Sequence, residues 1–520
     1  MAMRNSLVIS ACGILMVLVV TVMGGCTLSP LENRTVTRAL DAQESAQTAL
    51  GQEISVIENT QNEKSGVYII GDPQLAFAAR ILLSQRAEKT MDLQYYIWEA
   101  DVTGTLMFET IVDAANRGVR VRLLLDDNGI EGLDDAFFVL NNHANIEVRI
   151  FNPFVQRKLK WLGYITHFNR VNRRMHNKSF TVDNVATVIG GRNIADDYFG
   201  ATEHVLKEDI DVIAVGEIVS HVSTDFDIYW ASLSAYPIDQ LLNVKDDAQY
   251  STGALFPSQL NNPERNAYIE LIKESSIIDA LTNGKLSFTW AKVDMISDSP
   301  TKTLHANQDE DLLVFKLHQV IGQPSQGVLI ISPYFVPTKA AVTHFVELAE
   351  QGINVSILTN SMQATDVLPV HAGYAKHRKT LLRAGVSLFE LKSTRANENR
   401  LKDKLGPFGS SASSLHAKLF AIDDERLFIG SFNFDPRSIN LNTELGFVIH
   451  SNELTEQVNA EFAQHVRSAA YELVLTEDED IIWKEIVDGE LKYHESEPGL
   501  GIVSGVALSI LSVLPIDSLL

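Results

Sequence analysis

Two segments of this 520-residue chain carry the same set of residues that can bind and transfer phosphoryl groups. Each has a histidine, a lysine two positions later, an aspartate and an asparagine behind a glycine: His176, Lys178, Asp183 and Asn193, then His416, Lys418, Asp423 and Asn433. Every residue of the second set lies 240 positions after its counterpart. Because lysine and asparagine can neutralise phosphoryl oxygens beside a reactive imidazole, the repeated set predicts a site for phosphoryl chemistry.

The presence of two histidines solves a chemical conflict. One imidazole cannot be nucleophile and leaving-group acid at once, since the first role needs the neutral form and the second needs imidazolium. If the two halves of the chain pack face to face, one histidine forms a phosphohistidine. The other then protonates the departing alcohol and later deprotonates the incoming one.

Each imidazole also needs a carboxylate on its other nitrogen, which fixes the tautomer and raises basicity. Candidates lie downstream in matching predicted strands, at Asp209 in "KEDIDVIAVG" and Glu444 in "NTELGFVIH". From spacing alone, ordinary surface charge at a strand start explains these two acids equally well.

A lone His-x-Lys pair on a strand is more often a surface pair than a site. We keep that interpretation for four other histidines, His143, His221, His318 and His465. The double coincidence of five residue types, including Gly190 and Gly430, makes it a poor explanation for His176 and His416. No cysteine or nearby His, Asp and Glu cluster supplies a closed zinc ligand set, so no metal site is predicted.

The segments around the two sets also repeat, and they predict the elements that position them. In each half an amphipathic helix ends at a glycine and feeds an apolar strand: residues 102–118 and 119–127, then 338–352 and 353–360. Two more strand pairs match, 92–98 with 327–336 and 145–153 with 385–392. The alternation predicts an α/β fold with helices on both sheet faces and the histidine and lysine side by side on a strand.

The repeats divide the chain into predicted regions. These are an N-terminal repeat at 66–300, a C-terminal repeat at 301–475 and an extension at 476–520, with residues 231–300 as an insertion at the junction. Before them, Arg4, an apolar run and Gly-Gly-Cys predict a secretory signal at 1–25. The signal resembles a lipoprotein lipobox, which makes Cys26 the expected lipidated residue, and an uncleaved anchor is the alternative. Residues 26–65 are polar and predict a tether with one helix.

"HNKSFTVD" and "HAKLFAID" are two HxKxxxxD motifs, and in this pattern the chain resembles the phospholipase D superfamily. Further segments resemble the bacterial cardiolipin synthase C family, from about residue 70 to the end: "RGVRVRLLLDDNG", "GGRNIADDYFG", "HAGYAKHRKTLLRAGV" and "GSFNFDPRSINLNTELGFVI" are among them. The resemblance implies a duplicated phospholipase D-like α/β fold. Two α/β sandwich halves with pseudo-two-fold symmetry would share one metal-independent, cofactor-free active site at their interface.

The resemblance further implies a phosphatidyl transferase that joins a phosphatidyl group to phosphatidylglycerol and so makes cardiolipin. Its lipid partners would be phosphatidylglycerol and, as a second candidate donor, phosphatidylethanolamine. His176 would be the nucleophile and His416 the general acid and base. The other implied roles are phosphate binding by Lys178, Lys418, Asn193 and Asn433, support of the motif by Asp183 and Asp423, and orientation of the histidines by Asp209 and Glu444. The second repeat has Ser431 where the first has Gly191, so a hydroxyl contact with substrate is expected on one side only.

Two segments are expected to meet lipid. No acidic residue lies between Glu147 and Asp183, where cations and aromatic residues gather instead: Arg157, Lys158, Lys160, Arg170, Arg173, Arg174 and Lys178 with Trp161, Tyr164 and Phe168. This stretch suits anionic headgroups, and a solvated loop is the alternative. The apolar tail at 500–515 is too short to span a bilayer, so it is expected to lie in the interface or to pack on the body.

The formal charge of −23 argues against a nucleic-acid partner, because so acidic a surface repels phosphate backbones. A nuclease is therefore disfavoured among enzymes with these motifs. A hydrolytic phospholipase D stays open, since water and a glycerol hydroxyl attack the same phosphohistidine. An inactive lipoprotein scaffold conflicts with the intact motifs. The expected location is the bacterial cell envelope, facing the periplasm from the outer or inner membrane.

Overall fold

The computed structural model describes residues 28–501, except 29, 33, 59–60, 62, 202–205, 243–254, 257–261, 274–285, 306–308, 394–412 and 488, and also residues 505, 508 and 511. The predicted signal, Cys26 and most of the apolar tail lie outside these residues. Within the described part of the chain, no helix has the length and apolar character needed to cross a membrane.

The first half is a mixed sheet whose centre is parallel and whose flanks are antiparallel. Its strands in spatial order are β9 (Ala235–Pro237), β4 (Ile146–Phe151), β3 (Arg120–Gly129), β2 (Thr90–Ile97), β5 (Ser179–Val182), β6 (Ala186–Gly190), β8 (Asp211–Val215) and β1 (Ser65–Ile70).

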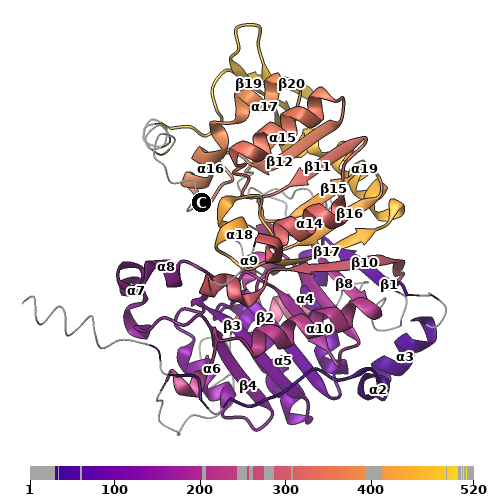
Figure 1. Ribbon diagram of the computed structural model, residues 1–520, viewed down its shortest axis with the longest axis vertical. Helices are drawn as coiled ribbons and strands as arrows, with labels where there is room; N and C mark the ends of the chain where they lie inside the picture. The colour runs from indigo at the N-terminus through magenta and orange to yellow at the C-terminus, as the bar shows by residue number, and fades with distance from the viewer. Residues whose placement is uncertain are drawn as a thin grey trace, which may run out of the picture.

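The second half repeats this order strand for strand. Its strands are β18 (Ala470–Leu475), β13 (Ser387–Leu391), β12 (Asn354–Asn360), β11 (Gly327–Ile331), β15 (Leu419–Ile422), β16 (Arg426–Gly430), β17 (Leu445–His450) and β10 (Thr289–Ser297), with β19 (Ile481–Val487) and β20 (Glu490–His494) added beyond β18. Antiparallel pairing of β1 with β10 joins the halves, so these strands form one 18-stranded sheet. In Figure 1 the second half, orange to yellow, stands above the first.

Helices cover both faces of each sheet, as the sequence predicts. One face of the first sheet carries α4 (Pro73–Arg86) and α5 (Val102–Asn116), and the same face of the second carries α15 (Lys339–Glu350). The other faces carry α10 (Glu217–Trp230) and α19 (Asn452–Ala469), and these faces share one hydrophobic cluster. That cluster joins Ile189 and Val212 of the first half to Ile429 and Phe447 of the second. Burial of this shared apolar surface holds the halves together.

The helices and strands predicted around the two motifs are confirmed. Residues 102–118 and 338–352 contain α5 and α15, and β3 and β12 follow them. Gly118 and Gly352 end these helices with φ of 99° and 84°, a conformation that glycine adopts without strain.

The prediction that residues 231–300 are an insertion is wrong for two strands within this range, which have counterparts in the other half. By position in the sheet, β9 is the counterpart of β18, and β10 is the counterpart of β1. A three-residue edge strand such as β9 has too few positions to show a periodic pattern. Since β10 pairs six residues with β17 and three with β1, the second sheet begins before the predicted boundary at 301.

The predicted tether at 26–65 is wrong for residues 34–58, which pack on the first half. The helices α2 (Ala42–Ser45) and α3 (Ala49–Glu58) occupy part of it. Ahead of them, guanidinium groups of the sheet donate to its backbone carbonyls: Arg149 to Thr35, Arg122 to Thr37 and Arg120 to Arg38. A polar composition did not reveal these bonds, because the donors lie far away in sequence.

Candidate active site

The two His-x-Lys segments precede strands rather than lie within them, which corrects the sequence prediction. His176 and Lys178 stand in an extended segment before β5, and His416 and Lys418 stand in the same place before β15. The segments lie outside the strand ladders, although the Gly430 amide at the end of β16 donates to the Lys418 carbonyl at 3.3 Å.

Each segment bonds across the junction to the other half. The His176 amide donates to the Thr443 carbonyl at 2.8 Å, and Thr443 donates back to Arg174 at 2.9 Å. In the second copy, His416 donates to the Glu208 carbonyl at 2.7 Å, and β14 (Ser413–Leu415) pairs in parallel with β7 (Leu206–Glu208). The backbone thereby brings each histidine beside the acidic segment of the opposite half.

The carboxylates consequently pair with the histidines in a crossed arrangement. His176 Nδ1 lies 2.8 Å from Glu444 Oε2, and His416 Nδ1 lies 2.5 Å from Asp209 Oδ2. The two acids are equivalent in the fold: Asp209 lies two residues before Asp211, the partner of Gly190, and Glu444 lies two residues before Gly446, the partner of Gly430. Neither half therefore contains a complete histidine–carboxylate pair.

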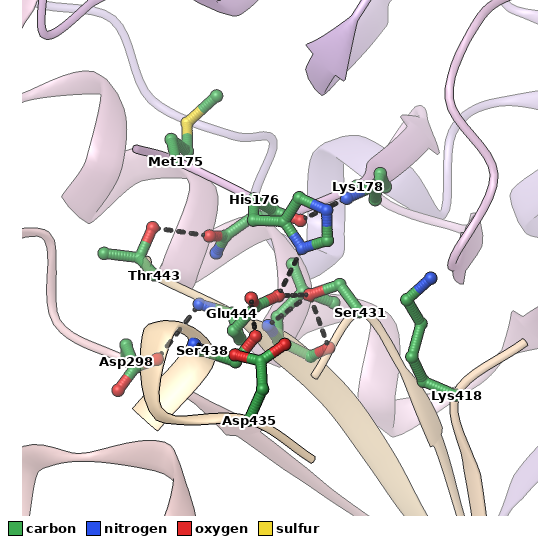
Figure 2. Close-up of polar contacts among 12 residues, drawn as sticks. Met175, His176, Lys178, Asp298, Lys418, Ser431, Asp435, Ser438, Thr443 and Glu444 are labelled. Carbon is green, nitrogen blue, oxygen red and sulfur yellow. Dashed lines mark hydrogen bonds and ion pairs between the residues drawn. The ribbon is translucent and has the colours of Figure 1, made fainter. Parts of the chain in front are cut away.

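Glu444 is fully buried and is held on both oxygens (Figure 2). Its Oε2 also accepts from the Ser431 hydroxyl at 2.5 Å, and its Oε1 accepts from the Ser438 hydroxyl at 3.0 Å. Its amide donates to Asp298 at 3.0 Å. Burial raises the pKa of Glu444 to about 7, because the ionised carboxylate loses its hydration.

Ser431 and Gly191 differ because their partner acids differ. A Cβ at Gly191 would lie 2.2 Å from Asp209 Oδ1, so only glycine leaves room for that carboxylate. On the opposite side the Ser431 hydroxyl instead donates to Glu444. The predicted substrate contact of Ser431 is thus replaced by a bond that orients the acid.

The two lysines are buried, and each lies beside its histidine. Lys178 Nζ donates to the His176 carbonyl at 2.7 Å, and Lys418 Nζ donates to the His416 carbonyl. Burial lowers the pKa of Lys178 well below 10.5 and that of Lys418 to about 8. Two cations with so little water around them form a strong anion site.

Both imidazoles are neutral at rest. Burial, and then the nearby ammonium groups of Lys178 and Lys418, lower the pKa of His176 and of His416 well below 6.5. On His176 the Glu444 carboxylate beside Nδ1 assigns the proton to that nitrogen and leaves a lone pair on Nε2. The surroundings of the rings differ: Lys418 Nζ lies 2.8 Å from Nδ1 and 3.2 Å from Nε2 of His416, whereas the Lys178 ammonium donates to the His176 carbonyl.

The two asparagines have unlike surroundings. The Asn193 side chain accepts from the Ile97 amide at 3.0 Å and donates to the Tyr198 hydroxyl at 2.9 Å. The side-chain oxygen of Asn433 is buried and has no hydrogen-bond partner among the described residues. Their predicted contact with phosphate stays a prediction, and Asn193 would have to release Tyr198 to make it.

Asp183 and Asp423 hold the hairpins that follow the histidines. Both have left-handed backbones, with φ of 52° and 53°. The Asp183 carboxylate accepts from the amides of residues 88–90 at 2.7–2.9 Å, and Asp423 accepts from those of residues 325–327 at 2.7–3.2 Å. These bonds fix the start of the neighbouring strands β2 and β11, away from the histidine side chains.

Several site residues were not found from the sequence. Tyr96 packs edge-on to His176 and Tyr198 packs edge-on to His416, each with ring centroids 5.1 Å apart. Tyr198 and Ser438 occupy the same repeat position, 240 residues apart, and both reach the site. A search for identical residue types missed them, although a comparison of repeat positions would have found them. For Asp298, which accepts from the Glu444 amide, the repeat offset gave no comparable indication.

Three cations of the predicted basic stretch are paired with acids within the protein. Arg157 contacts the carboxylates of Asp127 and Asp134, and Lys160 lies 3.0 Å from Asp127. Arg174 is buried against Asp126 at 3.1 Å. The charges of these three residues therefore serve the fold. Lys158 stays exposed, and the expectation that the stretch meets headgroups stays a prediction.

Comparison with known proteins now adds to this geometry. A family model described as "Cardiolipin synthase, PLD-like domain" matches residues 82–230 and 317–466, one match for each half. Cardiolipin synthase C of Escherichia coli is 47% identical over 448 residues, which cover 86% of this chain and 94% of that protein. The chain belongs to the cardiolipin synthase family of phospholipase D-like proteins.

Two further proteins show more distant similarity. Cardiolipin synthase 1 of Bacillus anthracis is 24% identical, over 73% of this chain and 62% of that protein. The crystal structure of phosphatidylserine synthase from Haemophilus influenzae matches with a TM-score of 0.52 and 16% identity, covering 81% of this chain and 91% of that one. The structural match confirms the predicted duplicated α/β fold.

Proposed function

We propose that this protein is a phosphatidyl transferase that makes cardiolipin at the site shared by its two halves. The observation that carries the proposal is the crossed pairing of His176 with Glu444 and of His416 with Asp209. Two equivalent but separately held imidazoles can take the two roles that one imidazole cannot combine.

In the first step, Nε2 of His176 attacks the phosphorus of a phosphatidyl donor. The bond from phosphorus to the headgroup oxygen breaks, and His416 gives that oxygen a proton. Bound phosphate supplies a negative charge that opposes the effect of the lysines on His416 and favours its imidazolium. Lys178 and Lys418 neutralise the phosphoryl oxygens as charge builds on them.

In the second step, a glycerol hydroxyl of phosphatidylglycerol attacks the phosphohistidine. His416 accepts the hydroxyl proton, the bond from phosphorus to Nε2 breaks, and cardiolipin leaves with His176 restored. Phosphatidylglycerol or phosphatidylethanolamine would be the donor. We place the protein in the bacterial envelope, anchored through Cys26 and facing the periplasm.

The test is incubation of the full-length protein with phosphatidylglycerol vesicles, with and without phosphatidylethanolamine, followed by lipid mass spectrometry. Cardiolipin is the expected product, and His176→Ala should abolish it. Exposed His318 on α14 (Leu313–Ile321) offers a matched control, since His318→Ala should retain activity. Phosphatidic acid as the sole product would show that the enzyme is a hydrolase and not a transferase. If no lipid product formed, the protein would be an inactive scaffold.

A further inference from the structure

A cluster of exposed apolar side chains lies on and beside α7 (Lys160–Thr166). Its members and their exposed fractions are Leu159 50%, Trp161 59%, Tyr164 36%, Ile165 71% and Phe168 41%. In Figure 1, α7 and the adjoining α8 (Phe168–Val171) project at the left edge of the first half, near its border with the second. So dense an apolar surface, held out from the core, marks an interaction site.

Polar contacts fix α7 in this exposed position. Arg157 bridges the carboxylates of Asp127 and Asp134 just before the helix, and Lys160 Nζ donates to the Asp127 carbonyl at 2.6 Å. The Tyr164 hydroxyl donates to Asn128 at 2.7 Å. The apolar side chains are therefore presented outward by a braced segment.

The charge around α7 points to an anionic lipid surface. The chain has a formal charge of −23, yet it carries no Asp or Glu at residues 148–182. Asp127 and Asp134 pair with Arg157 and Lys160, whereas Arg170 and Arg173 donate to backbone carbonyls and Lys158 is exposed beside the apolar cluster. Aromatic and aliphatic side chains next to cations suit the boundary between anionic headgroups and acyl chains.

A short chain of contacts joins α7 to the candidate nucleophile. Tyr164 bonds Asn128, Asn128 donates to the Tyr96 hydroxyl at 3.0 Å, and the Tyr96 ring packs on His176 with centroids 5.1 Å apart. We propose that α7 inserts its apolar side chains into the surface of an anionic bilayer and so holds His176 at the lipid headgroups. The proposal deepens the proposed function and rests on it for the role of His176.

Tryptophan fluorescence tests the insertion in the full-length protein. Of the five tryptophans, Trp98, Trp230 and Trp483 are buried and Trp290 is half-buried, so Trp161 is the exposed one. The emission of Trp161 is the difference between the spectra of the wild type and Trp161→Phe. Phosphatidylglycerol vesicles that contain brominated acyl chains should quench this difference about twofold or more. Aqueous iodide should not quench that emission. Quenching by iodide and not by bromine would overturn the proposal.

Activity gives a second readout. Trp161→Ser with Ile165→Ser should lower turnover of vesicle phosphatidylglycerol about tenfold and leave turnover of detergent-dispersed lipid nearly unchanged. Exposed Leu491 and Tyr493 on β20 provide the control pair, whose serine variants should behave as wild type. Equal losses on both substrates would assign the cluster to a protein contact and refute membrane docking.

His176→Ala separates this proposal from the proposed function. It should abolish turnover while bromine quenching of Trp161 persists. If bromine quenched Trp161 in a wild-type protein that made no cardiolipin, the proposed function would be overturned and membrane docking by α7 would stand. Turnover on vesicles without quenching would overturn the docking role alone.

Discussion

At the scale of single residues, the contrast between Gly191 and Ser431 shows how each acid is held. Gly191 leaves space that the Asp209 carboxylate fills, whereas Ser431 contributes a hydroxyl that binds Glu444. The sequence revealed the difference but not its cause, because the identity of the facing acid depends on packing between distant segments.

Exchanging the two residues should therefore give unequal results. Gly191→Ser should lower kcat about a hundredfold or more, because its Cβ collides with Asp209 and displaces the partner of His416. Ser431→Gly removes one hydrogen bond to a carboxylate and should cost about tenfold or less. Steady-state kinetics, with thermal melts to confirm folding, compare them. Equal losses would contradict this account of the acids.

The pH dependence of activity should report the buried lysine Lys418. Its pKa is lowered from 10.5 to about 8, so the charged form that binds phosphate disappears as pH rises through about 8. We expect kcat/KM to fall there, and Lys418→Arg should move the falling limb upward, since arginine stays protonated. If the fall of kcat/KM occurred at the same pH in Lys418→Arg as in the wild type, another group would be responsible for it.

The same shift affects stability with a defined sign. Lys418 loses its proton on folding between pH 8 and 10.5, so the folded state binds fewer protons there. Burial of the charged Lys418 lowers the free energy of unfolding below about pH 8. This loss disappears as pH rises towards 10.5, so the free energy of unfolding increases over that range.

At the scale of elements, the helices and long strands were predictable because their apolar periodicity is local. Four features were not predictable, since bonds to distant parts of the chain determine them. They are the three-residue strand β9, the strand β10, the docked segment at 34–58 and the extended His-x-Lys segments. Asp183 and Asp423 were predictable in part. The sequence motif identifies them, but only the fold shows that each accepts hydrogen bonds from the start of a neighbouring strand.

Removal of one hairpin aspartate should reduce stability. Asp183→Ala would leave three backbone amides of residues 88–90 without their acceptor, and the free energy of unfolding should fall by about 2–4 kcal/mol. Urea unfolding measures the change, with exposed Glu131→Ala as a control that stays near wild type. An unchanged midpoint for Asp183→Ala would refute its supporting role.

At the scale of the whole molecule, duplication explains both the fold and the site. The repeat of residues predicted two α/β halves with one shared site, and the family match confirms the fold and the family. The crossed exchange of acids was not predictable, because an offset of 240 residues does not say which half supplies which partner. Backbone pairing across the junction decides it.

The halves have also diverged. Residues 34–40 lie along β3 and β4 of the first half, bound by Arg120, Arg122 and Arg149. At the equivalent place in the second half, the sheet carries Asn354 and Ser356 and lines a cavity of about 630 Å³. The site is symmetric in its histidines and lysines, while the surfaces that surround it are not.

The most direct test of the shared site is to trap its covalent intermediate. His416→Ala lacks both the acid of the first step and the base of the second, so the donor should carry a leaving group that needs no proton, such as p-nitrophenolate. The phosphohistidine that then forms should persist, and peptide mass spectrometry can locate the adduct. We predict a phosphatidyl group on His176, and none when His176→Ala is added. An adduct on a residue other than His176 in His416→Ala, or full turnover by that variant without an adduct, would contradict the account.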